Sequence, residues 1–287
     1  MKQTIFLTIC GLPNVGKSTL LNKLLNEKIS IMSPKPNTTR TNIRGILTEG
    51  DVQIVFTDTP GISLRQKKNT IEKQIYSNAM SSLGEAEVGL ILVNCTNKIH
   101  EIEKIVAKFK ENHLPYAIGI NKIDKTKEND QIVFANELYE KFNPQELFFI
   151  SALTGKNCEK IVDFAKKHAK DTDEWFFNEK EKTDMQPEFW IKEIIREKVF
   201  VVLEKEIPYA IGVSVEEIAI EGNEVGIFAT IYSIKDSHKP IIIGRQGDNI
   251  KKIVELCTED IKLNLGLIAK LQLTVKIDEK WFTKIEI

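Results

Sequence analysis

The sequence predicts two domains, a larger α/β domain with a mostly parallel sheet and a smaller α+β domain after it. The chain has 287 residues, about twice the length of a typical domain. Short apolar runs alternate with segments of helical periodicity as far as residue 167, an order typical of parallel sheets. A charged, aperiodic stretch follows. We therefore expect domains at residues 1–170 and 188–287, joined by a linker at 171–187.

The first predicted strand, Ile5 to Cys10, leads into a glycine-rich loop and then a helix. Glycines let successive backbone N–H groups wrap around an anion at the positive end of the helix dipole. A lysine there would reach the β and γ phosphates of a nucleotide, and a serine hydroxyl would bind Mg²⁺. A plain glycine turn is the alternative, and the loop does not choose between ATP and GTP. The candidate residues are Gly11, Leu12, Pro13, Asn14, Val15, Gly16, Lys17, Ser18 and Thr19.

A loop and a β-hairpin are expected next. Two prolines and an asparagine keep residues 33–40 out of regular structure, and 42–48 and 52–57 predict the two strands of the hairpin. The second strand ends in Asp58-Thr59-Pro60-Gly61. The aspartate can hold Mg²⁺ through its water shell, and the glycine N–H can meet a γ phosphate. Its position after the phosphate loop favours a nucleotide-dependent switch over an ordinary turn.

The rest of the first domain continues the alternation of helix and strand. Helices are expected at 70–83, 99–110, 130–142 and 157–167, and strands at 88–94, 116–120 and 147–150. The strand at 116–120 ends in Asn121-Lys122-Ile123-Asp124. An aspartate can accept two hydrogen bonds from guanine, whereas adenine offers no such donor pair, so this motif predicts GTP. Ser151-Ala152-Leu153, at the next strand end, can place a backbone N–H on the guanine O6.

The second domain predicts a single-strand nucleic-acid site. An amphipathic helix at 189–200, strands at 211–220 and 225–232, a Gly-x-x-Gly turn between helices and a strand at 270–277 follow in order. The turn lets a sugar-phosphate backbone approach, and a neighbouring apolar groove accommodates unstacked bases. An ordinary packing module is the alternative. The candidate residues are Ile243, Gly244, Arg245, Gln246, Gly247, Asn249, Ile250, Lys251 and Lys252.

Composition bounds the compartment and the partners. The net charge of −1 gives no global attraction to nucleic acid, so RNA must be held by a local patch. The four cysteines lack metal or disulfide spacing, which is typical of a reducing cytosol. No secretion signal precedes the first strand, and no apolar run reaches about 18 residues. We expect a cytoplasmic protein.

The motifs together resemble the Era family of the TrmE-Era-EngA-like GTPase superfamily. The resemblance rests on Gly-x-Pro-Asn-Val-Gly-Lys-Ser, Thr-Thr-Arg and Asp-Thr-Pro-Gly, with a second domain similar to a type II KH domain, and it spans nearly the whole chain. It implies a P-loop GTPase that converts GTP to GDP and phosphate with Mg²⁺, and that binds 16S rRNA near its 3′ end during assembly of the small (30S) ribosomal subunit. It also implies a monomer and peripheral attachment to the inner face of the membrane.

The resemblance also assigns roles to residues of the first domain. Mg²⁺ would be bound by Ser18, Asp58 and Thr39, with Thr38 as the alternative to Thr39. Catalytic roles fall to Lys17, Thr39, Gly61 and Asn14, the last by holding a potassium ion near the β–γ bridge.

The sequence departs from related patterns at three places. Ile62 follows Asp-x-x-Gly where many signalling GTPases have a glutamine that orients water. This leaves open a second class, a module that binds GTP as a structural ligand without meaningful hydrolysis. The turn has Arg245-Gln246 where a lysine is common, and a longer tail after Trp281 is expected. A tRNA-modifying relative would carry a folate-binding domain and a terminal Cys motif, and this sequence has neither.

Overall fold

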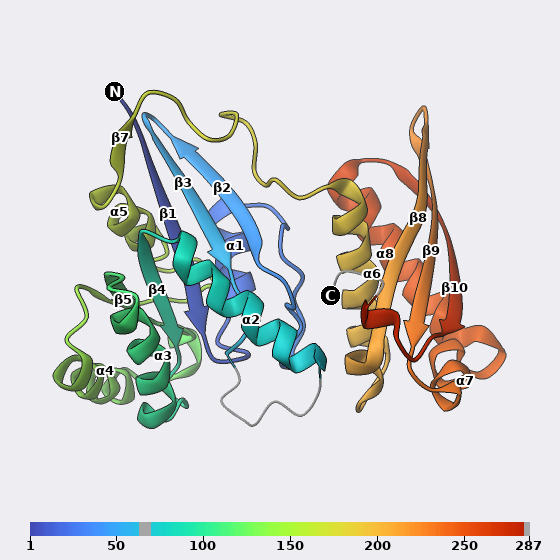
Figure 1. Cartoon of the computed structure of the whole chain (residues 1–287), viewed down its shortest axis with the longest axis horizontal. Helices are drawn as coiled ribbons and strands as arrows, with labels where there is room; N and C mark the ends of the chain where they lie inside the picture. Colours follow the sequence, from blue (N-terminus) through green and yellow to red (C-terminus); the bar gives the residue numbers. More distant parts are fainter. Residues whose placement is uncertain (63–69, 284–287) are drawn as a thin grey trace. The chain divides into compact units, whose positions relative to one another are not determined.

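The structure, a computed structural model, describes residues 1–62 and 70–283. The chain divides into two compact units, Met1–Asp184 and Met185–Ile287 (Figure 1). Among the described residues, no helix is long and apolar enough to span a bilayer.

The first unit is built on a mostly parallel sheet, as the sequence predicts. Neighbouring strands follow the order β2-β3-β1-β4-β5-β6, with β7 paired to the start of β1. All pairs are parallel except β2 with β3 and β7 with β1. The strands are β1 (Lys2–Gly11), β2 (Ile43–Glu49), β3 (Val52–Asp58), β4 (Val88–Val93), β5 (Tyr116–Ile120), β6 (Leu147–Phe149) and β7 (Lys170–Thr172).

Helices cover both faces of this sheet, and Figure 1 shows α2 and α3 in front of it and α1 behind it. Every residue of β4 and β5 is buried, which explains their continuous apolar sequences. Gly89 in β4 lies under the Phe109 ring, where a Cβ atom would come within 1.9 Å. The helices are α1 (Lys17–Leu25), α2 (Thr70–Glu85), α3 (Ile99–Glu111), α4 (Glu128–Phe142) and α5 (Glu159–Lys167).

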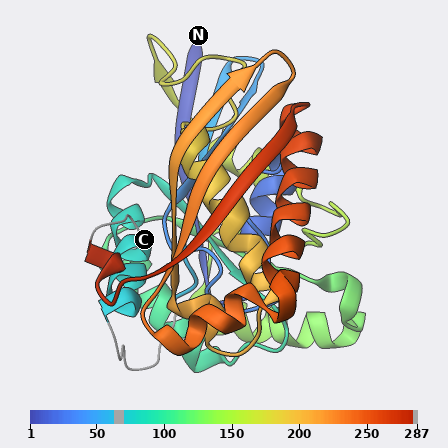
Figure 2. The same cartoon turned by 90° about the vertical axis from the view of Figure 1, so that its right-hand side faces the viewer.

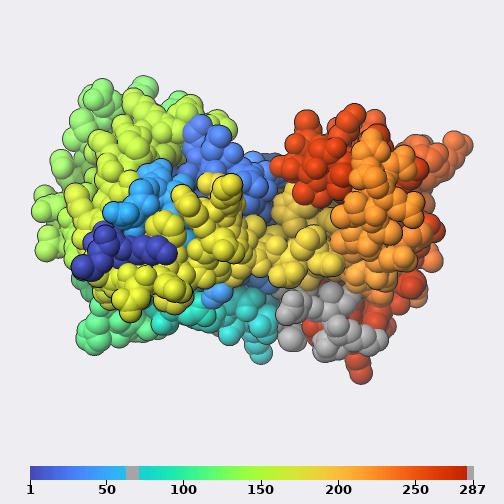
Figure 3. Space-filling model, turned by 90° about the horizontal axis from the view of Figure 1, so that it is seen from above, coloured from blue at the N-terminus to red at the C-terminus, as the bar shows by residue number. Residues whose placement is uncertain are grey.

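The expected linker differs from the structure over most of its length. Lys170–Thr172 form β7, and the following residues 173–184, the edge segment, belong to the first unit. Gln53 is fully buried, and its side chain donates to the Phe177 carbonyl (2.9 Å) and accepts from the Phe177 N–H (3.0 Å). The Ile46 N–H in β2 donates to the Lys182 carbonyl (2.8 Å). Figure 3 shows this stretch in yellow on the surface of the first unit.

The second unit has a three-stranded sheet with helices packed against it (Figure 2). Its strands follow the order β10-β9-β8, in which β8 and β9 form the predicted antiparallel hairpin and β10 runs parallel to β9. The buried Trp281 ring lies over Gly212, where a Cβ atom would come within 2.4 Å. The elements are α6 (Pro187–Val202), β8 (Ile211–Glu221), β9 (Glu224–Ser233), α7 (Lys239–Ile243), α8 (Asp248–Leu265) and β10 (Ile268–Ile277).

Candidate functional site

The loop between β1 and α1 curls around the ammonium group of Lys17. The buried Nζ atom donates to the carbonyl oxygens of Leu12 (3.1 Å) and Gly11 (3.4 Å). Gly16 has φ of 101°, and a Cβ atom there would come within 2.4 Å of the Asn121 amide, so the loop requires glycine at this position. Burial lowers the pKa of Lys17, and the Asp58 carboxylate partly offsets this shift. The loop thus presents a cation at the N-terminus of α1.

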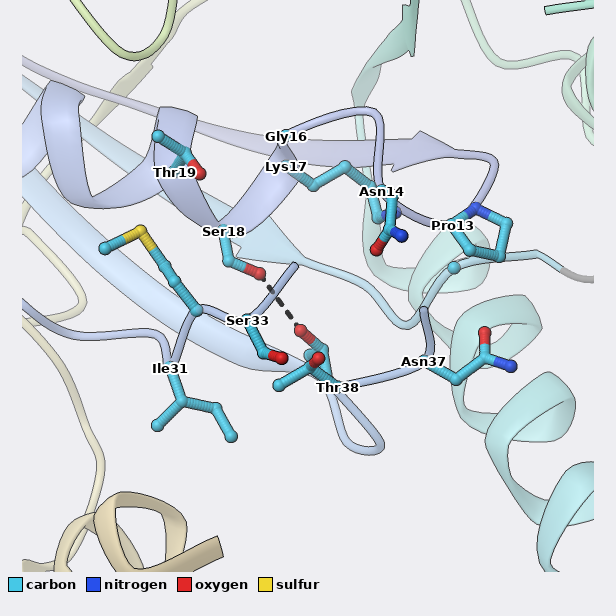
Figure 4. Close-up of a pocket in the computed structure, with 13 residues that line it drawn as sticks. Pro13, Asn14, Gly16, Lys17, Ser18, Thr19, Ile31, Ser33, Asn37 and Thr38 are labelled. Carbon is cyan, nitrogen blue, oxygen red and sulfur yellow. Dashed lines mark hydrogen bonds between the residues drawn. The ribbon is translucent and has the colours of Figure 1, made fainter. Parts of the chain in front are cut away.

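Three oxygen-bearing side chains from separate elements meet beside this loop. The Ser18 hydroxyl at the start of α1 donates to Oδ2 of Asp58 (2.6 Å) and lies 3.0 Å from the Thr39 hydroxyl. Oδ1 of Asp58 is buried and has no hydrogen-bond partner among the described residues. Burial raises the pKa of Asp58, against the attraction of Lys17 and the hydrogen bond from Ser18. Figure 4 shows Ser18 facing the loop that carries Thr38.

The loop at residues 33–40 distinguishes between the two candidate threonines. The Thr39 hydroxyl faces Ser18, whereas the Thr38 hydroxyl donates to the Lys35 carbonyl (2.8 Å) of its own loop. The Asn14 amide nitrogen reaches across from the phosphate loop and donates to the Pro34 carbonyl (3.0 Å). The geometry therefore favours Thr39 as the partner of Ser18.

The Asp58-to-Gly61 segment leaves β3 and closes against the phosphate loop. The Thr59 hydroxyl donates to the Ile9 carbonyl (2.9 Å), and the Ile62 N–H donates to the Gly11 carbonyl (3.0 Å). Gly61, which follows Pro60, lies so close to Pro13 that a Cβ atom would come within 2.7 Å of the proline Cα. Part of the expected switch after Gly61 falls at residues 63–69, outside the described residues.

The residues predicted to recognise the base converge on the other side of the loop. The buried Asn121 donates to the Val15 carbonyl and accepts from the Ala152 N–H, both at 2.8 Å. Lys122 donates to the Asn14 carbonyl (2.5 Å). Ile123 begins the turn that bears the exposed Asp124, and Leu153 is exposed beyond Ala152. The phosphate and base motifs, far apart in the sequence, thus share direct hydrogen bonds.

A serine hydroxyl holds the Asp124 carboxylate from the end of the neighbouring strand. The Ser151 hydroxyl donates to Asp124 Oδ1 (2.6 Å) and so fixes one of the two carboxylate oxygens.

Sequence reasoning missed two side chains that support these loops. Asn22 in α1 accepts from the N–H groups of Ile29 (2.9 Å) and Ser30 (2.8 Å), at the base of the loop that leads to Thr39. Gln131 in α4 donates to the carbonyls of Ile123 and Thr126. For Gln131 the available signal was a polar residue at a position where the helical pattern of α4 calls for a buried side chain.

In the second unit, the Gly-x-x-Gly turn joins α7 to α8. Gly244 and Gly247 have positive φ angles of 80° and 83°, and a Cβ atom on Gly244 would come within 2.7 Å of the Asn249 backbone nitrogen. Arg245 and Gln246 are exposed between the two glycines. The remaining candidates lie beside the turn: Ile243, Asn249 and Ile250 are partly buried, and Lys251 and Lys252 are exposed on α8. The exposed side chains of Arg245 and Gln246 therefore lie between two glycines that have no side chains of their own.

Two family models match the chain, one in each unit. Residues 6–122 match the family described as 50S ribosome-binding GTPase, and residues 206–282 match the KH domain family.

Similar proteins match over nearly the whole chain. GTPase Era of Trichlorobacter lovleyi is 40% identical over 280 residues, covering 96% of this chain and 93% of the relative. GTPase Era of Caldicellulosiruptor saccharolyticus is 37% identical over 284 residues, covering 96% and 92%. A crystal structure of an Aquifex aeolicus Era variant bound to GDP and AlF4⁻ has a TM-score of 0.92 at 34% identity, covering 97% of this chain and 95% of that one. Era in complex with MgGDPNP and nucleotides 1506–1542 of 16S rRNA has the same TM-score and identity, covering 98% and 95%.

Proposed function

Because the chain belongs to the Era family of GTPases, we propose that it is a GTP-driven switch that binds 16S rRNA near its 3′ end and assists assembly of the small ribosomal subunit. The family that matches the first unit is described as 50S ribosome-binding GTPase, which would suggest the large subunit. The Era structure bound to 16S rRNA matches over 98% of the chain, including the second unit, and 16S rRNA belongs to the small subunit. The longer likeness decides for the small subunit. The observation that carries the proposal is the meeting of Ser18, Thr39 and Asp58 beside Lys17.

These residues fit a magnesium ion bound to a nucleotide. Mg²⁺ prefers oxygen ligands, and Asp58 holds a buried oxygen with no described hydrogen-bond partner next to two hydroxyl groups. Ser18 and Thr39 would bind the ion directly, and Asp58 through its water shell. When bound, the ion supplies positive charge to the β and γ phosphates.

The chain's own groups complete the phosphate site. The Lys17 ammonium group donates hydrogen bonds to carbonyl oxygens of the phosphate loop. The β and γ phosphates would lie in this loop, where the positive charge of Lys17 would stabilise their negative charge. The Gly61 N–H would meet the γ phosphate. Ile62 is buried, with 3% of its surface exposed, and its side chain has no polar atom to orient water. Hydrolysis therefore needs charge from elsewhere.

We assign that charge to a potassium ion held by Asn14. The Asn14 amide and the Pro34 carbonyl lie 3.0 Å apart, and rotation of the amide by half a turn would bring two neutral oxygens toward one cation. Positive charge near the β–γ bridge would contribute ~3 kcal/mol, about a hundredfold in rate.

Single-turnover phosphate release tests both the hydrolysis and the potassium ion. We expect slow release in sodium, faster release in potassium, and no response to potassium in Asn14→Ala. Asn37→Ala, a change of the same kind in the same pocket, should keep the potassium response. Equal wild-type rates in the two salts would refute the potassium ion. Absence of release in either salt would instead support the alternative, a module that holds GTP as a structural ligand.

RNA binding is assigned to the turn between α7 and α8. Gly244 and Gly247 have positive φ angles and no side chains, so a sugar-phosphate backbone could approach this turn, and the Arg245 guanidinium group can donate two parallel hydrogen bonds to a phosphate. Lys251 and Lys252 add positive charge on the first turn of α8. This local patch suits single-stranded rRNA although the chain has a net charge of −1.

The edge segment offers a route by which the nucleotide state reaches the second unit. Arg44 in β2 pairs with Glu85 at the end of α2 (2.7 Å) and with Asp184 (3.0 Å), the last residue of the first unit. The Thr183 hydroxyl also donates to the Arg44 carbonyl (2.7 Å). A shift of the loop before β2 or of α2 would therefore move the point where the second unit begins. We infer that GTP strengthens RNA binding at the turn between Gly244 and Gly247 and that GDP weakens it.

The protein's location follows from the family resemblance. We place it in the cytoplasm, with peripheral attachment to the inner face of the membrane. Fractionation of cells into cytosol and membranes tests this assignment.

A further inference from the structure

Asp124 is presented by a short turn whose backbone is held by neighbouring elements. Asp124 lies in a single turn of 3₁₀ helix, Ile123–Lys125, and the preceding Lys122 is left-handed, with φ of 65°. The Ile123 N–H is tied to the Ile150 carbonyl by a long hydrogen bond of 3.3 Å. Left-handed backbone at a lysine is costly and persists only where its surroundings fix it.

Gln131 supplies a second anchor from the inward face of α4. Its amide nitrogen donates to the carbonyls of Ile123 (3.1 Å) and Thr126 (2.8 Å), and it lies 3.1 Å from the Thr126 hydroxyl. The side chain is only 9% exposed, beside the buried Phe134 and Leu138 on the same face of the helix. Burial of an amide is unfavourable unless its hydrogen bonds are made, and here they are made to the residues on either side of Asp124.

We propose that Gln131 is a positioning residue for guanine recognition. It does not touch the base. It joins the carbonyl before Asp124 to the carbonyl two residues after it, and so holds the carboxylate where both of its oxygens can meet guanine. The inference rests on the proposed role of Asp124.

The size of the effect follows from the population of the competent turn. Without Gln131, two carbonyls lose their donor and the left-handed Lys122 loses support, so the turn spends less time in the binding conformation. The contacts between Asp124 and the base form only in that conformation, whereas the loop around Lys17 can hold the phosphates in either. The nucleotide with more contacts to Asp124 therefore loses more affinity. The loss of about two hydrogen bonds predicts a roughly tenfold to thirtyfold weaker binding of GDP.

Competition binding with GDP and inosine diphosphate tests this role. Inosine diphosphate lacks the exocyclic amino group and draws on only one of the two Asp124 hydrogen bonds. In Gln131→Leu, GDP should therefore lose more affinity than inosine diphosphate, and the preference for GDP should narrow by roughly threefold or more. Asn136→Ala, on the exposed face of the same helix, should keep the wild-type preference. Thermal unfolding confirms that each variant is folded.

Gln131→Glu adds a readout that loss of packing would not produce. An ionised carboxylate has no proton to donate to the two carbonyls, whereas the protonated acid donates one hydrogen bond. GDP affinity of this variant should therefore rise several-fold as the pH falls from about 8 to 5.5. The wild type and Asn136→Asp should not show this rise. They serve as controls for pH effects from the other titratable groups around the turn, which are Cys95, Lys122, Asp124, Lys125 and Asp130.

The outcomes separate this inference from the proposed function. A wild type that does not prefer GDP to inosine diphosphate would remove the role of Asp124 and of Gln131 together. A normal wild-type preference that stays unchanged in Gln131→Leu, or equal losses for both nucleotides, would overturn the role of Gln131 alone. So would a Gln131→Glu variant whose affinity follows the wild-type pH profile.

Discussion

Replacement of Asp124 by Asn changes one atom of the base-recognition site and should reverse its preference. The Ser151 hydroxyl donates to Oδ1 of Asp124 (2.6 Å), and an Asn side chain can keep that bond by placing its carbonyl oxygen on the same side. Its NH2 group then takes the place of the second carboxylate oxygen. A hydrogen-bond donor of guanine would then face the Asn NH2 group, which is also a donor.

The magnitude follows from the hydrogen bonds that are lost. A hydrogen bond to a charged group contributes about 1.5 to 3 kcal/mol, and the opposing donors add the cost of an unpaired polar group. GTP binding should weaken by roughly 2 to 4 kcal/mol, about thirtyfold to a thousandfold. Xanthosine triphosphate carries a carbonyl where guanine has its amino group, so its affinity should rise in the same variant.

Displacement of a fluorescent GDP analogue by GTP, ATP and xanthosine triphosphate measures these affinities directly. Asp130→Asn makes the same chemical change on the exposed surface of α4 and should leave all of them at wild-type values. Equal affinity of the wild type for ATP and GTP would refute the assignment of guanine recognition to Asp124. An Asp124→Asn variant with unchanged GTP affinity would do the same.

Three further predictions concern other parts of the first unit. Trypsin cleavage after Arg40 should slow when Mg²⁺ and a non-hydrolysable GTP analogue are bound, since Thr39 then closes on the ion; an unchanged rate would argue against a switch. Gln53→Leu leaves the backbone of Phe177 without its two partners and should lower the urea-measured free energy of unfolding by about 1 to 3 kcal/mol, whereas no change would mean that the edge segment adds no stability. Burial raises the pKa of Cys158 to about 11, so less thiolate is present at a given pH. Alkylation of Cys158, followed by peptide mass spectrometry, should be roughly a hundredfold slower than that of an ordinary thiol. An ordinary alkylation rate would contradict this burial.

The sheet and its order of helices follow from signals that the sequence carries locally. Strand β4 is apolar at every position because both of its faces are covered, and α3 repeats apolar residues at helical spacing. The parallel order also places the ends of β1, β3, β5 and β6 at one edge. This is why motifs as distant as Val15 and Asn121 could be expected to meet, and they share a 2.8 Å hydrogen bond.

The edge segment could not be predicted because its partners lie far away in the sequence, on strands of the first unit. Residues 173–184 are charged and aperiodic, which is the composition of a linker. The partner of Phe177 is Gln53, 124 positions away, and neither residue alone indicates the pairing. Phe176 packs edge-on against Phe6 in β1, an attachment that only the fold reveals.

The support of the site was equally hidden from sequence. The choice between Thr38 and Thr39 depends on which hydroxyl turns toward Ser18, and spacing cannot decide between adjacent residues. Gln131 lies outside every motif, and its role is visible only from the carbonyls it contacts.

We propose that the nucleotide bound to the first unit controls RNA binding by the second. Titration of a labelled fragment of the 16S rRNA 3′ end, with the protein loaded with GDP or with a non-hydrolysable GTP analogue, tests it most directly. Coupling of ~1 to 3 kcal/mol predicts affinities that differ by roughly 5- to 150-fold in favour of the GTP state, with RNA tightening GTP by the same factor. Arg245→Asp with Gln246→Asp should abolish RNA binding and leave GTP affinity nearly intact. Equal RNA affinity in the two states would contradict the claim and leave two independent modules on one chain.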